Sequence, residues 1–222
     1  MVSEFGYTTA SKVATKLRTS FDTTTSPSLA DVEELISEQE ALINQYAGRR
    51  FDQYPVSNEY HDHNGSAFIT LENPLVSITT LEYTLDNGDT WVTVPNTDYI
   101  VEADYNRIER KIGGSTNTHK WPSVSGQRTV RITYNAGYSS PPARIAALAL
   151  DMSVLAVIRT LLNAQSNEEG GDIKVGPIEI GESRLLNNPG YVRNLQDSVE
   201  NRLNNLGGSR LWTSVSKSWS QG

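Results

Sequence analysis

The stretch "VRITYNAGYSSPPARIAALALDM" (residues 130–152) decides the fold. Its first half alternates apolar and polar residues, as a half-buried β-strand does. A turn ending in Pro141-Pro142 follows, and Pro142 suits the first position of a helix because the N–H that proline lacks has no partner there. The apolar residues after it fit a long helix. The sequence therefore predicts an abrupt change from sheet to helix in the middle of the chain.

Helical patterns also precede this stretch. Residues 8–18 predict a short helix with Thr8 or Thr9 as its N-cap. Ser28 begins a stronger helix, and Gly48 has the residue type that commonly ends one. The apolar face of this second helix has helical spacing. Its members are Leu29, Val32, Leu35, Ile36, Leu42, Ile43 and Tyr46.

Between these helices and the decisive stretch, the apolar period is two. The segment from about residue 56 to residue 138 is rich in β-branched and aromatic residues and predicts about five to seven short strands. Asn87-Gly88 suits a type I′ hairpin turn, which needs a positive φ at both central residues. Short strands separated by such turns are typical of a small antiparallel sandwich or barrel.

A last helix is expected near the C-terminus. Asn188-Pro189 caps it, and Gly207-Gly208 stops it. The predicted fold class is therefore α+β, a four-helix bundle of two N-terminal and two C-terminal helices with an inserted antiparallel β-sandwich or barrel-like region. The predicted parts are residues 1–54 and 141–206 for the bundle, 55–140 for the β insert, 164–187 for a loop or hairpin, and 207–222 for a tail.

Composition excludes several functions. The chain has 222 residues, no cysteine and a formal net charge of -7. The charge argues against a nucleic-acid binder, because phosphate binding needs a basic field. The missing cysteines exclude disulfides, thiolate metal sites and cysteine nucleophiles. Residues 143–162 form the most apolar window, but charged residues interrupt it, and no apolar leader is visible at the N-terminus, so no membrane partner is expected.

Few residues suggest chemistry. His61 and His63 would point the same way on a strand and could give two zinc ligands, but no spacing announces a third, so surface or turn histidines are the expected reading. Scattered carboxylates could serve a hydrolase, yet solvated strand faces explain them better. No nucleophile elbow, phosphate loop or dinucleotide motif is present. We therefore expect no catalytic residues, no metal and no cofactor, and a protein that is not an enzyme.

Three stretches resemble one known family, the head-tail adaptor (connector) proteins of tailed bacteriophages and related archaeal tailed viruses. In that family a helix ends in a Y-x-G-R-x-F-like pattern, strands begin with proline and hydrophobic residues, and a strand ending in aromatic-x-x-G-Tyr leads through proline into an Ala/Leu-rich helix. The matching residues are Tyr46, Gly48, Arg49 and Phe51; Pro74, Val76 and Ile78; and Tyr134, Gly137, Tyr138, Pro141 or Pro142, Ile145, Ala147 and Leu150.

The resemblance implies a structural virion protein of the head-tail neck, assembled in the host cytoplasm. Such a protein forms a homo-oligomeric ring of about twelve subunits under the portal protein, joins the neck and tail proteins, and lets viral DNA pass without specific binding. A helix that is apolar nearly all round suits burial by its own core or between ring neighbours. The candidate ring-interface residues are Ile145, Leu148, Met152, Leu155 and Ile158.

Isolated aromatic residues in the polar tail predict a docking segment. In the resembled family the C-terminal segment engages the portal, and isolated tryptophans make good anchors for a partner's groove. The alternative is a tail that folds back on its own helices or stays unstructured. The candidate portal-binding residues are Leu211, Trp212, Val215 and Trp219.

Two other functions stay open at this point. One is a different neck ring, of the stopper or tail-terminator type, although those tend to be mostly β. The other is a binding module that uses the β insert for a host or virion partner. An exposed aromatic cluster on the β insert would favour the binding module. Its candidate members are Tyr54, Tyr60, Tyr99, Tyr105 and Trp121.

Overall fold

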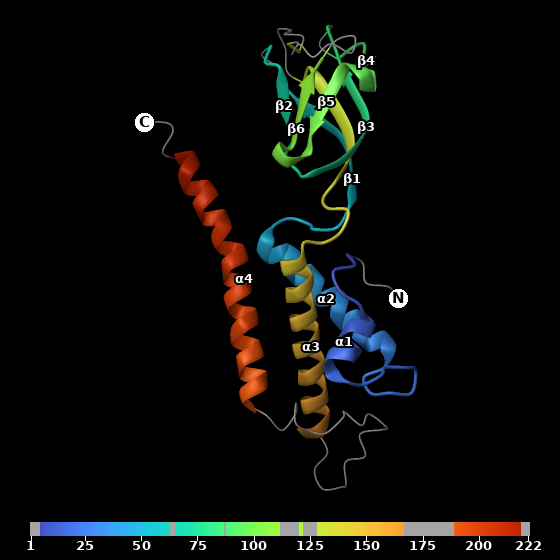
Figure 1. Ribbon diagram of the computed structural model, residues 1–222, viewed down its shortest axis with the longest axis vertical. Coiled ribbons are helices and arrows are strands. Elements are labelled where there is room, and N and C mark those ends of the chain that lie inside the picture. The colour runs from blue at the N-terminus through green and yellow to red at the C-terminus, as the bar shows by residue number, and fades with distance from the viewer. Residues whose placement is uncertain are drawn as a thin grey trace. The chain divides into compact units, whose positions relative to one another are not determined.

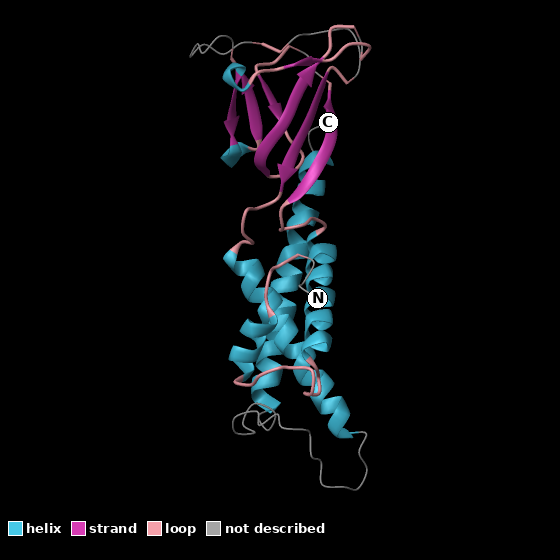
Figure 2. Cartoon of the chain, turned by 90° about the vertical axis from the view of Figure 1, so that its right-hand side faces the viewer, coloured by secondary structure: helices cyan, strands magenta, loops and turns pink. Residues whose placement is uncertain are grey.

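The structure is a computed structural model that describes residues 5–62, 65–86, 88–111, 120–121, 128–166 and 189–218. The chain divides into two compact units. The helical unit comprises Met1–Phe51 and Pro141–Gly222, and the β unit comprises Asp52–Ser140. The α-helices belong to the first unit and the strands to the second (Figures 1 and 2). The prediction of an α+β fold with four α-helices and antiparallel sheets is confirmed for the described residues.

The two N-terminal helices begin and end where local chemistry predicts. In α1 (Ala10–Leu17), the N-cap is Thr9, whose side chain accepts a backbone hydrogen bond from the first turn. In α2 (Leu29–Ala47), Ser28 forms a capping box with the first turn, so two backbone donors are satisfied at once. Gly48 ends α2 at φ 61°, a left-handed conformation that glycine adopts at low cost.

The two C-terminal helices are α3 (Ala143–Ser166) and α4 (Pro189–Ser218). The prediction that Gly207-Gly208 stops the last helix is wrong, because α4 continues through both glycines. A glycine inside a helix costs about 1 kcal/mol relative to alanine, which weakens a helix without forbidding it. The expected loop or hairpin at 164–187 lies outside the described residues beyond Ser166.

The core of the helical unit centres on α3, which contacts each of the other three helices. Ala143–Leu162 is long and apolar enough to cross a membrane, with a mean hydropathy of 2.0, but 61% of that window is buried inside the protein. Its apolarity is therefore that of a central core helix. The buried core cluster consists of Val13 and Leu17, Val32 and Ile36, Val154, Leu155, Val157, Ile158 and Leu161, and Leu195.

The described strands of the β unit form two antiparallel sheets, and these do not close into a barrel. The first sheet has the order β1-β7-β3-β4 and the second β2-β6-β5. The strands are β1 (Tyr54–His61), β2 (Phe68–Thr70), β3 (Leu75–Tyr83), β4 (Val92–Thr93), β5 (Tyr99–Glu102), β6 (Arg107–Arg110) and β7 (Val130–Ala136), with short 3₁₀ helices at Asn96–Asp98 and Ala103–Tyr105.

The decisive stretch supplies the centre of the first sheet. Strand β7 lies between β1 and β3, and its residues alternate in burial as the sequence predicts. Side chains from both sheets meet in one buried cluster. Its members are Ile69, Leu71, Leu75, Leu81, Val94, Ile108, Trp121, Val130, Ile132, Tyr134 and Ala136.

The connection between β3 and β4 is longer than predicted. The paired residues nearest the loop are Tyr83 and Val92, so this is no two-residue hairpin. A carboxylate organises the loop instead: Asp86 accepts a hydrogen bond of 2.8 Å from the backbone N–H of Thr90 and one of 2.6 Å from the Thr84 hydroxyl. These hydrogen bonds, the one from Thr84 foremost, lower the pKa of Asp86 to about 2.

Gly137, just after β7, is a position that only glycine fits. Its φ is +96°, and a Cβ there would lie 1.8 Å from the backbone oxygen of Asp52. The Gly137 N–H donates to the carbonyl oxygen of Pro74 at 2.9 Å. Three chain segments thus meet at one residue, because glycine lets the backbones approach each other closely.

Candidate interaction surfaces

The five candidate ring-interface residues of α3 lie inside the helical unit. Their exposed fractions are 0% for Ile145, 1% for Leu148, 5% for Met152, 5% for Leu155 and 0% for Ile158. Within one chain they are therefore already covered. Only their small exposed parts, such as those of Met152 and Leu155, are open to a neighbouring subunit in this arrangement of the helices.

A groove runs over the outside of α3, where α2 and α4 flank it. Its volume is about 400 Å³, and Met152 and Leu155 line it from α3. On the α2 side, Leu42 and Tyr46 border the groove and are 38% and 48% exposed. Leu203 borders it from α4. This groove leaves apolar side chains of the helical unit open to solvent.

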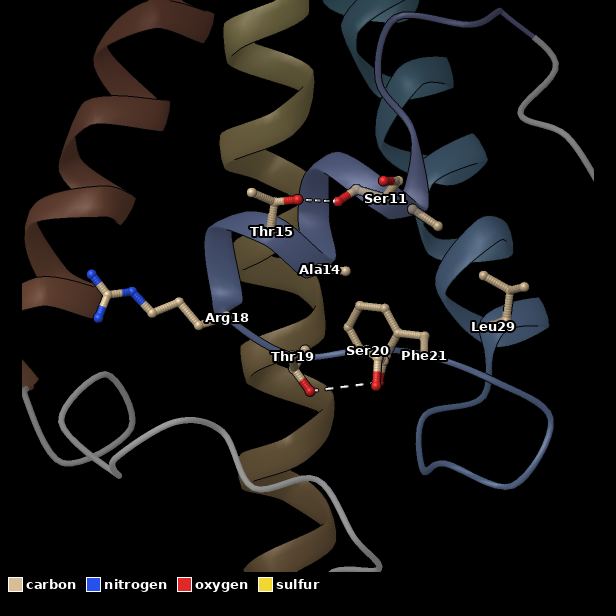
Figure 3. A pocket seen from close by; sticks show the side chains of 9 residues that line it. Ser11, Ala14, Thr15, Arg18, Thr19, Ser20, Phe21 and Leu29 are labelled. Atoms are coloured by element: carbon tan, nitrogen blue, oxygen red, sulfur yellow. Dashed lines mark hydrogen bonds between the residues drawn. The ribbon is translucent and has the colours of Figure 1, made fainter.

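A second hollow, of about 390 Å³, lies beside α1 (Figure 3). Ala10, Ala14, Phe21 and Leu29 give it an apolar lining, and the Arg18 side chain extends away from Phe21 and Leu29. The remaining lining residues are small hydroxyl residues. Among the described residues, its lining contains no carboxylate or histidine that could act as an acid or base. The described lining therefore resembles a small apolar hollow that could receive a side chain.

Asp151 ties three helices together. This residue of α3 is 7% exposed, and its carboxylate accepts hydrogen bonds from the Nζ atom of Lys16 on α1 and from the Nη1 atom of Arg202 on α4, the latter at 2.9 Å. A carboxylate removed from water needs such cationic partners, because an isolated buried charge is costly. Asp151 is thus the polar clamp between α1, α3 and α4.

A second buried acid holds the N-terminal segment. Glu40 of α2 is fully buried, and its Oε1 atom accepts the backbone N–H of Thr8 at 2.8 Å. Tyr7, the residue before Thr8, holds the same segment. Its hydroxyl donates to Asn44 at 2.7 Å and accepts the Phe51 N–H at 2.8 Å. Sequence reasoning missed Glu40 and gave Asp151 no role. The available signal was a charged residue in an apolar stripe, such as Glu40 between Ile36 and Ile43.

Arginines cover aromatic rings on the surface of the β unit. The Arg131 guanidinium lies 4.4 Å from the Trp91 ring centroid, and its Nε donates to Glu82 at 2.6 Å. The Arg128 guanidinium lies 5.3 Å from the ring of Tyr60. Such cation–π pairs shield ring faces and fix the arginine side chains.

The expected aromatic cluster on the β unit does not form as one exposed patch. Trp121 is 1% exposed and belongs to the core, so it is no member of an exposed cluster. Tyr54 and Tyr99 are partly buried and pack against the same core. Only Tyr60 and Tyr105 of the five are exposed, at 42% and 71%.

His61 belongs to a buried polar network. Its Nε2 atom lies 2.8 Å from Oε1 of Glu59, and the Tyr134 hydroxyl donates to the other carboxylate oxygen. Burial works to raise the pKa of Glu59, but the hydrogen bonds from His61 and Tyr134 outweigh it, and the pKa lies below its usual value. Burial, and next the hydrogen bond to Glu59, raise the pKa of Tyr134. Every group in this network has a partner, which fits a structural role.

The described residues contain no group of side chains suited to hold a metal ion. His63 lies outside them, and no group of three or more histidine, cysteine, aspartate or glutamate residues occurs within the ranges that the structure describes. The side chains of Leu211, Trp212 and Val215, and the whole of Trp219, also lie outside the described part of the chain. Portal binding by these four residues stays a prediction.

Comparisons with known proteins show distant structural similarity. No protein-family model matches the chain, and no curated protein matches it. Several solved structures are similar, among them the following three. The "Neck of empty GTA particle computed with C6 symmetry" has 13% identity and a TM-score of 0.43, covering 84% of this chain and 87% of the other. The "Neck of native GTA particle computed with C12 symmetry" has 13% identity and a TM-score of 0.41, covering 87% and 92%. The "Virion of native gene transfer agent (GTA) particle" has 14% identity and a TM-score of 0.35, covering 68% and 73%.

Proposed function

We propose that this chain is a structural virion protein, a head-tail adaptor that forms a homo-oligomeric ring under the portal. The ring extends the channel for viral DNA and joins the head to the neck and tail. The proposed location is the head-tail neck of a virion assembled in the host cytoplasm.

One observation supports the proposal: Gly137 of the third stretch lies against Asp52, the residue that follows the first stretch, and against Pro74 of the second. The first stretch ends at Phe51, directly before Asp52, whose carbonyl oxygen approaches the α-carbon of Gly137. The second begins at Pro74, whose carbonyl oxygen accepts the Gly137 N–H. The third contains Gly137 itself. The second and third motifs and the residue that follows the first thus meet within the β unit, as expected if the resemblance reflects a common fold.

The charge of the chain agrees with a conduit. A net charge of -7 repels the phosphates of passing DNA and does not bind them. The helical unit also has hollows and exposed apolar residues that can be covered on assembly. Another neck ring, of the stopper or tail-terminator type, is the alternative within the same class. The binding-module alternative loses its expected feature, since Trp121 is buried and arginine covers Tyr60.

Electron microscopy of particles tests the proposal directly. The expected result is a ring of this chain immediately beneath the portal, with the number of copies set by the symmetry of the portal ring. An epitope tag at the N-terminus, with tagged and untagged particles compared, identifies the density that belongs to this chain. Labelling at the capsid shell or the tail tip would contradict the proposal.

The tail hypothesis has its own test. Deleting residues 208–222 removes the candidate portal-binding residues and should abolish co-sedimentation with the purified portal. The circular dichroism of the helical unit should change only by the helix that is lost. A double variant, Trp212→Ala with Trp219→Ala, keeps the length of the tail and should weaken portal binding at least about tenfold if the tryptophans are anchors. Unchanged portal binding in both variants would contradict the hypothesis.

A further inference from the structure

The exposed face of α1 is basic. Ser11, Lys12, Thr15 and Arg18 are exposed along it, and the helix sequence ASKVATKL contains no acidic residue. Lys16 is the remaining cation of this helix, and Asp151 engages it. The next acid along the chain, Asp22, uses its carboxylate within its own loop, where it accepts hydrogen bonds from Thr24 and Thr25. The positive charges of Lys12 and Arg18 therefore face solvent.

The exposed face of α2 is acidic over its first half. Asp31, Glu34 and Glu38 are exposed at three- and four-residue spacing, so they form one stripe. The helix sequence LADVEELISEQEALINQYA contains no lysine or arginine. Asp31 keeps its charge to low pH, because its hydrogen bonds to Ser28 lower its pKa. The same stripe continues into the exposed Leu42.

The two faces match in length as well as in charge. At 1.5 Å per residue, Lys12 and Arg18 are about 9 Å apart along α1, and Asp31 and Glu38 about 10.5 Å apart along α2. Each face also adjoins apolar surface. The hollow lined by Phe21 lies beside α1, and Leu42 follows the acidic stripe.

We propose that these two faces bind each other between copies of this chain: the basic α1 face of one copy docks on the acidic α2 stripe of the next. This inference rests on the proposed ring function and names its subunit contact. Because the two faces are different surfaces, the contact is head-to-tail, and each added copy leaves one face of each kind open until the ring closes.

Charge and apolar surface have separate roles in this contact. Exposed ion pairs hold little by themselves, but complementary charge steers encounter and selects the register. Most of the free energy of association comes from burying Leu42 and Tyr46 against the apolar surface beside α1. Self-association should therefore weaken as salt rises, without vanishing at high salt.

Reversing the charge of each face separately tests the proposal. One variant carries Lys12→Glu with Arg18→Glu, so both of its faces are acidic. The other carries Glu34→Lys with Glu38→Lys, so both of its faces are basic. Either variant alone should self-associate at least about tenfold more weakly than the wild-type chain in analytical ultracentrifugation. An equimolar mixture should recover association, with the two variants alternating, because every contact in it joins opposite charges.

Control variants separate this contact from a general effect of charge. Asp89→Lys and Lys120→Glu change exposed charges of the β unit and should leave self-association unchanged. Thermal unfolding of every variant, followed by circular dichroism, shows whether it folds like the wild-type chain. A variant that fails to fold is replaced by its neutral counterpart, Lys12→Gln with Arg18→Gln or Glu34→Gln with Glu38→Gln, which should weaken self-association in the same direction.

Each outcome either supports or overturns the contact between α1 and α2 of neighbouring copies. Recovery in the mixture, with loss in each variant, supports the contact. A variant that associates like the wild type, a mixture that stays dissociated, or a wild-type chain that is monomeric at every concentration overturns it. Imaging of particles keeps the two proposals distinct. A ring seen at the portal with an overturned contact leaves the adaptor function standing, whereas recovery in the mixture without a ring on particles leaves only the self-association.

Discussion

The helical unit and the β unit differ in what surrounds their exposed apolar side chains. In the β unit, Arg131 and Arg128 lie over the rings of Trp91 and Tyr60, so the ring faces are already engaged. In the helical unit, Leu42 remains 38% exposed beside an open groove, and charges of opposite sign sit on different helices. The ring faces of Trp91 and Tyr60 thus have partners within the β unit, although Tyr105 remains 71% exposed there. In the helical unit the exposed apolar residues border a groove and lie near charged stripes, and the proposed subunit contact uses this combination.

The two units also differ in where the partners of an internal carboxylate come from. The partly buried carboxylate of the β unit, Glu59, is held within its own sheet by Tyr134 and His61. The buried carboxylate of the helical unit, Asp151, is held by cations from two other helices. The β unit is therefore expected to resist local change, and the helical unit to depend on how its helices are clamped.

The largest expected effect tests how rigid the β unit is. In Gly137→Ala, the new Cβ would meet the carbonyl of Asp52 at a φ that alanine adopts only with strain. We expect the free energy of unfolding of the β unit to fall by at least about 3 kcal/mol. Urea unfolding followed by hydrogen exchange of β7 measures this change.

A matched glycine supplies the control for that prediction. Gly88 also has a positive φ, of +104°, but a Cβ there would reach its nearest neighbour, a Trp91 ring atom, only at 4.0 Å. Gly88→Ala should therefore cost only the backbone strain, about 1 kcal/mol. Equal losses in the two variants would show that steric contact at Gly137 is unimportant.

A smaller effect is expected from removing the clamp of the helical unit. Asp151→Ala leaves Lys16 and Arg202 without their shared carboxylate, but both cations are partly exposed, at 32% and 44%. We expect a loss of about 2 kcal/mol, below the full value for breaking a buried ion pair. Hydrogen exchange in the first half of α4 should speed up most. Asp197→Ala, an exposed acid on the same helix, should change little, and unchanged exchange in both variants would contradict the clamp.

The smallest of these effects depends on pH. Tyr134→Phe removes the hydroxyl that bonds Glu59, so the pKa of Glu59 should rise. In the wild-type chain this folded pKa lies below the usual 4.5, so the stabilisation is present above pH 4.5 and is lost as the pH falls through the folded pKa. The variant should be about 1.5 kcal/mol less stable at pH 7, and the difference should shrink below pH 4.5.

Urea unfolding of the β unit at pH 7 and at pH 3.5 gives both values for this comparison. Tyr105→Phe is the control, since the Tyr105 ring is 71% exposed and Glu59 takes its tyrosine hydrogen bond from Tyr134. It should have no pH-dependent effect. A Tyr134→Phe variant whose loss is the same at both pH values would show that the hydroxyl does not act through the charge of Glu59.

Local features were predictable from the sequence. The caps at Thr9, Ser28 and Gly48 follow from side chains that bond their own backbone or from glycine's freedom at positive φ, so a few neighbouring residues decide them. The alternation in Val130–Ala136 likewise identifies the central strand and its buried face. Such features need no knowledge of the distant chain.

Features that depend on distant residues were missed. Asp151 can be buried because Lys16 and Arg202 bind its carboxylate. These partners lie 135 and 51 residues away in the sequence, so no local pattern reveals them. Trp121 enters the core of the β unit, where its backbone N–H donates to Ser66. The helix through Gly207-Gly208 shows the opposite case, in which a local stop signal of about 1 kcal/mol per glycine does not end the helix. Local propensity is a weak prior wherever tertiary contacts or helix continuity outweigh it.

The close approach of Asp52 and Gly137 has a consequence for how this protein could have evolved. The two ends of the β unit's chain lie against each other, and natural domain insertions have this form because a host fold then needs only a small opening to accept one. A recombination event could therefore exchange the whole β unit, or lengthen it, while the helices keep their own core. Diversity among relatives of this protein is accordingly expected to accumulate between residues 52 and 140.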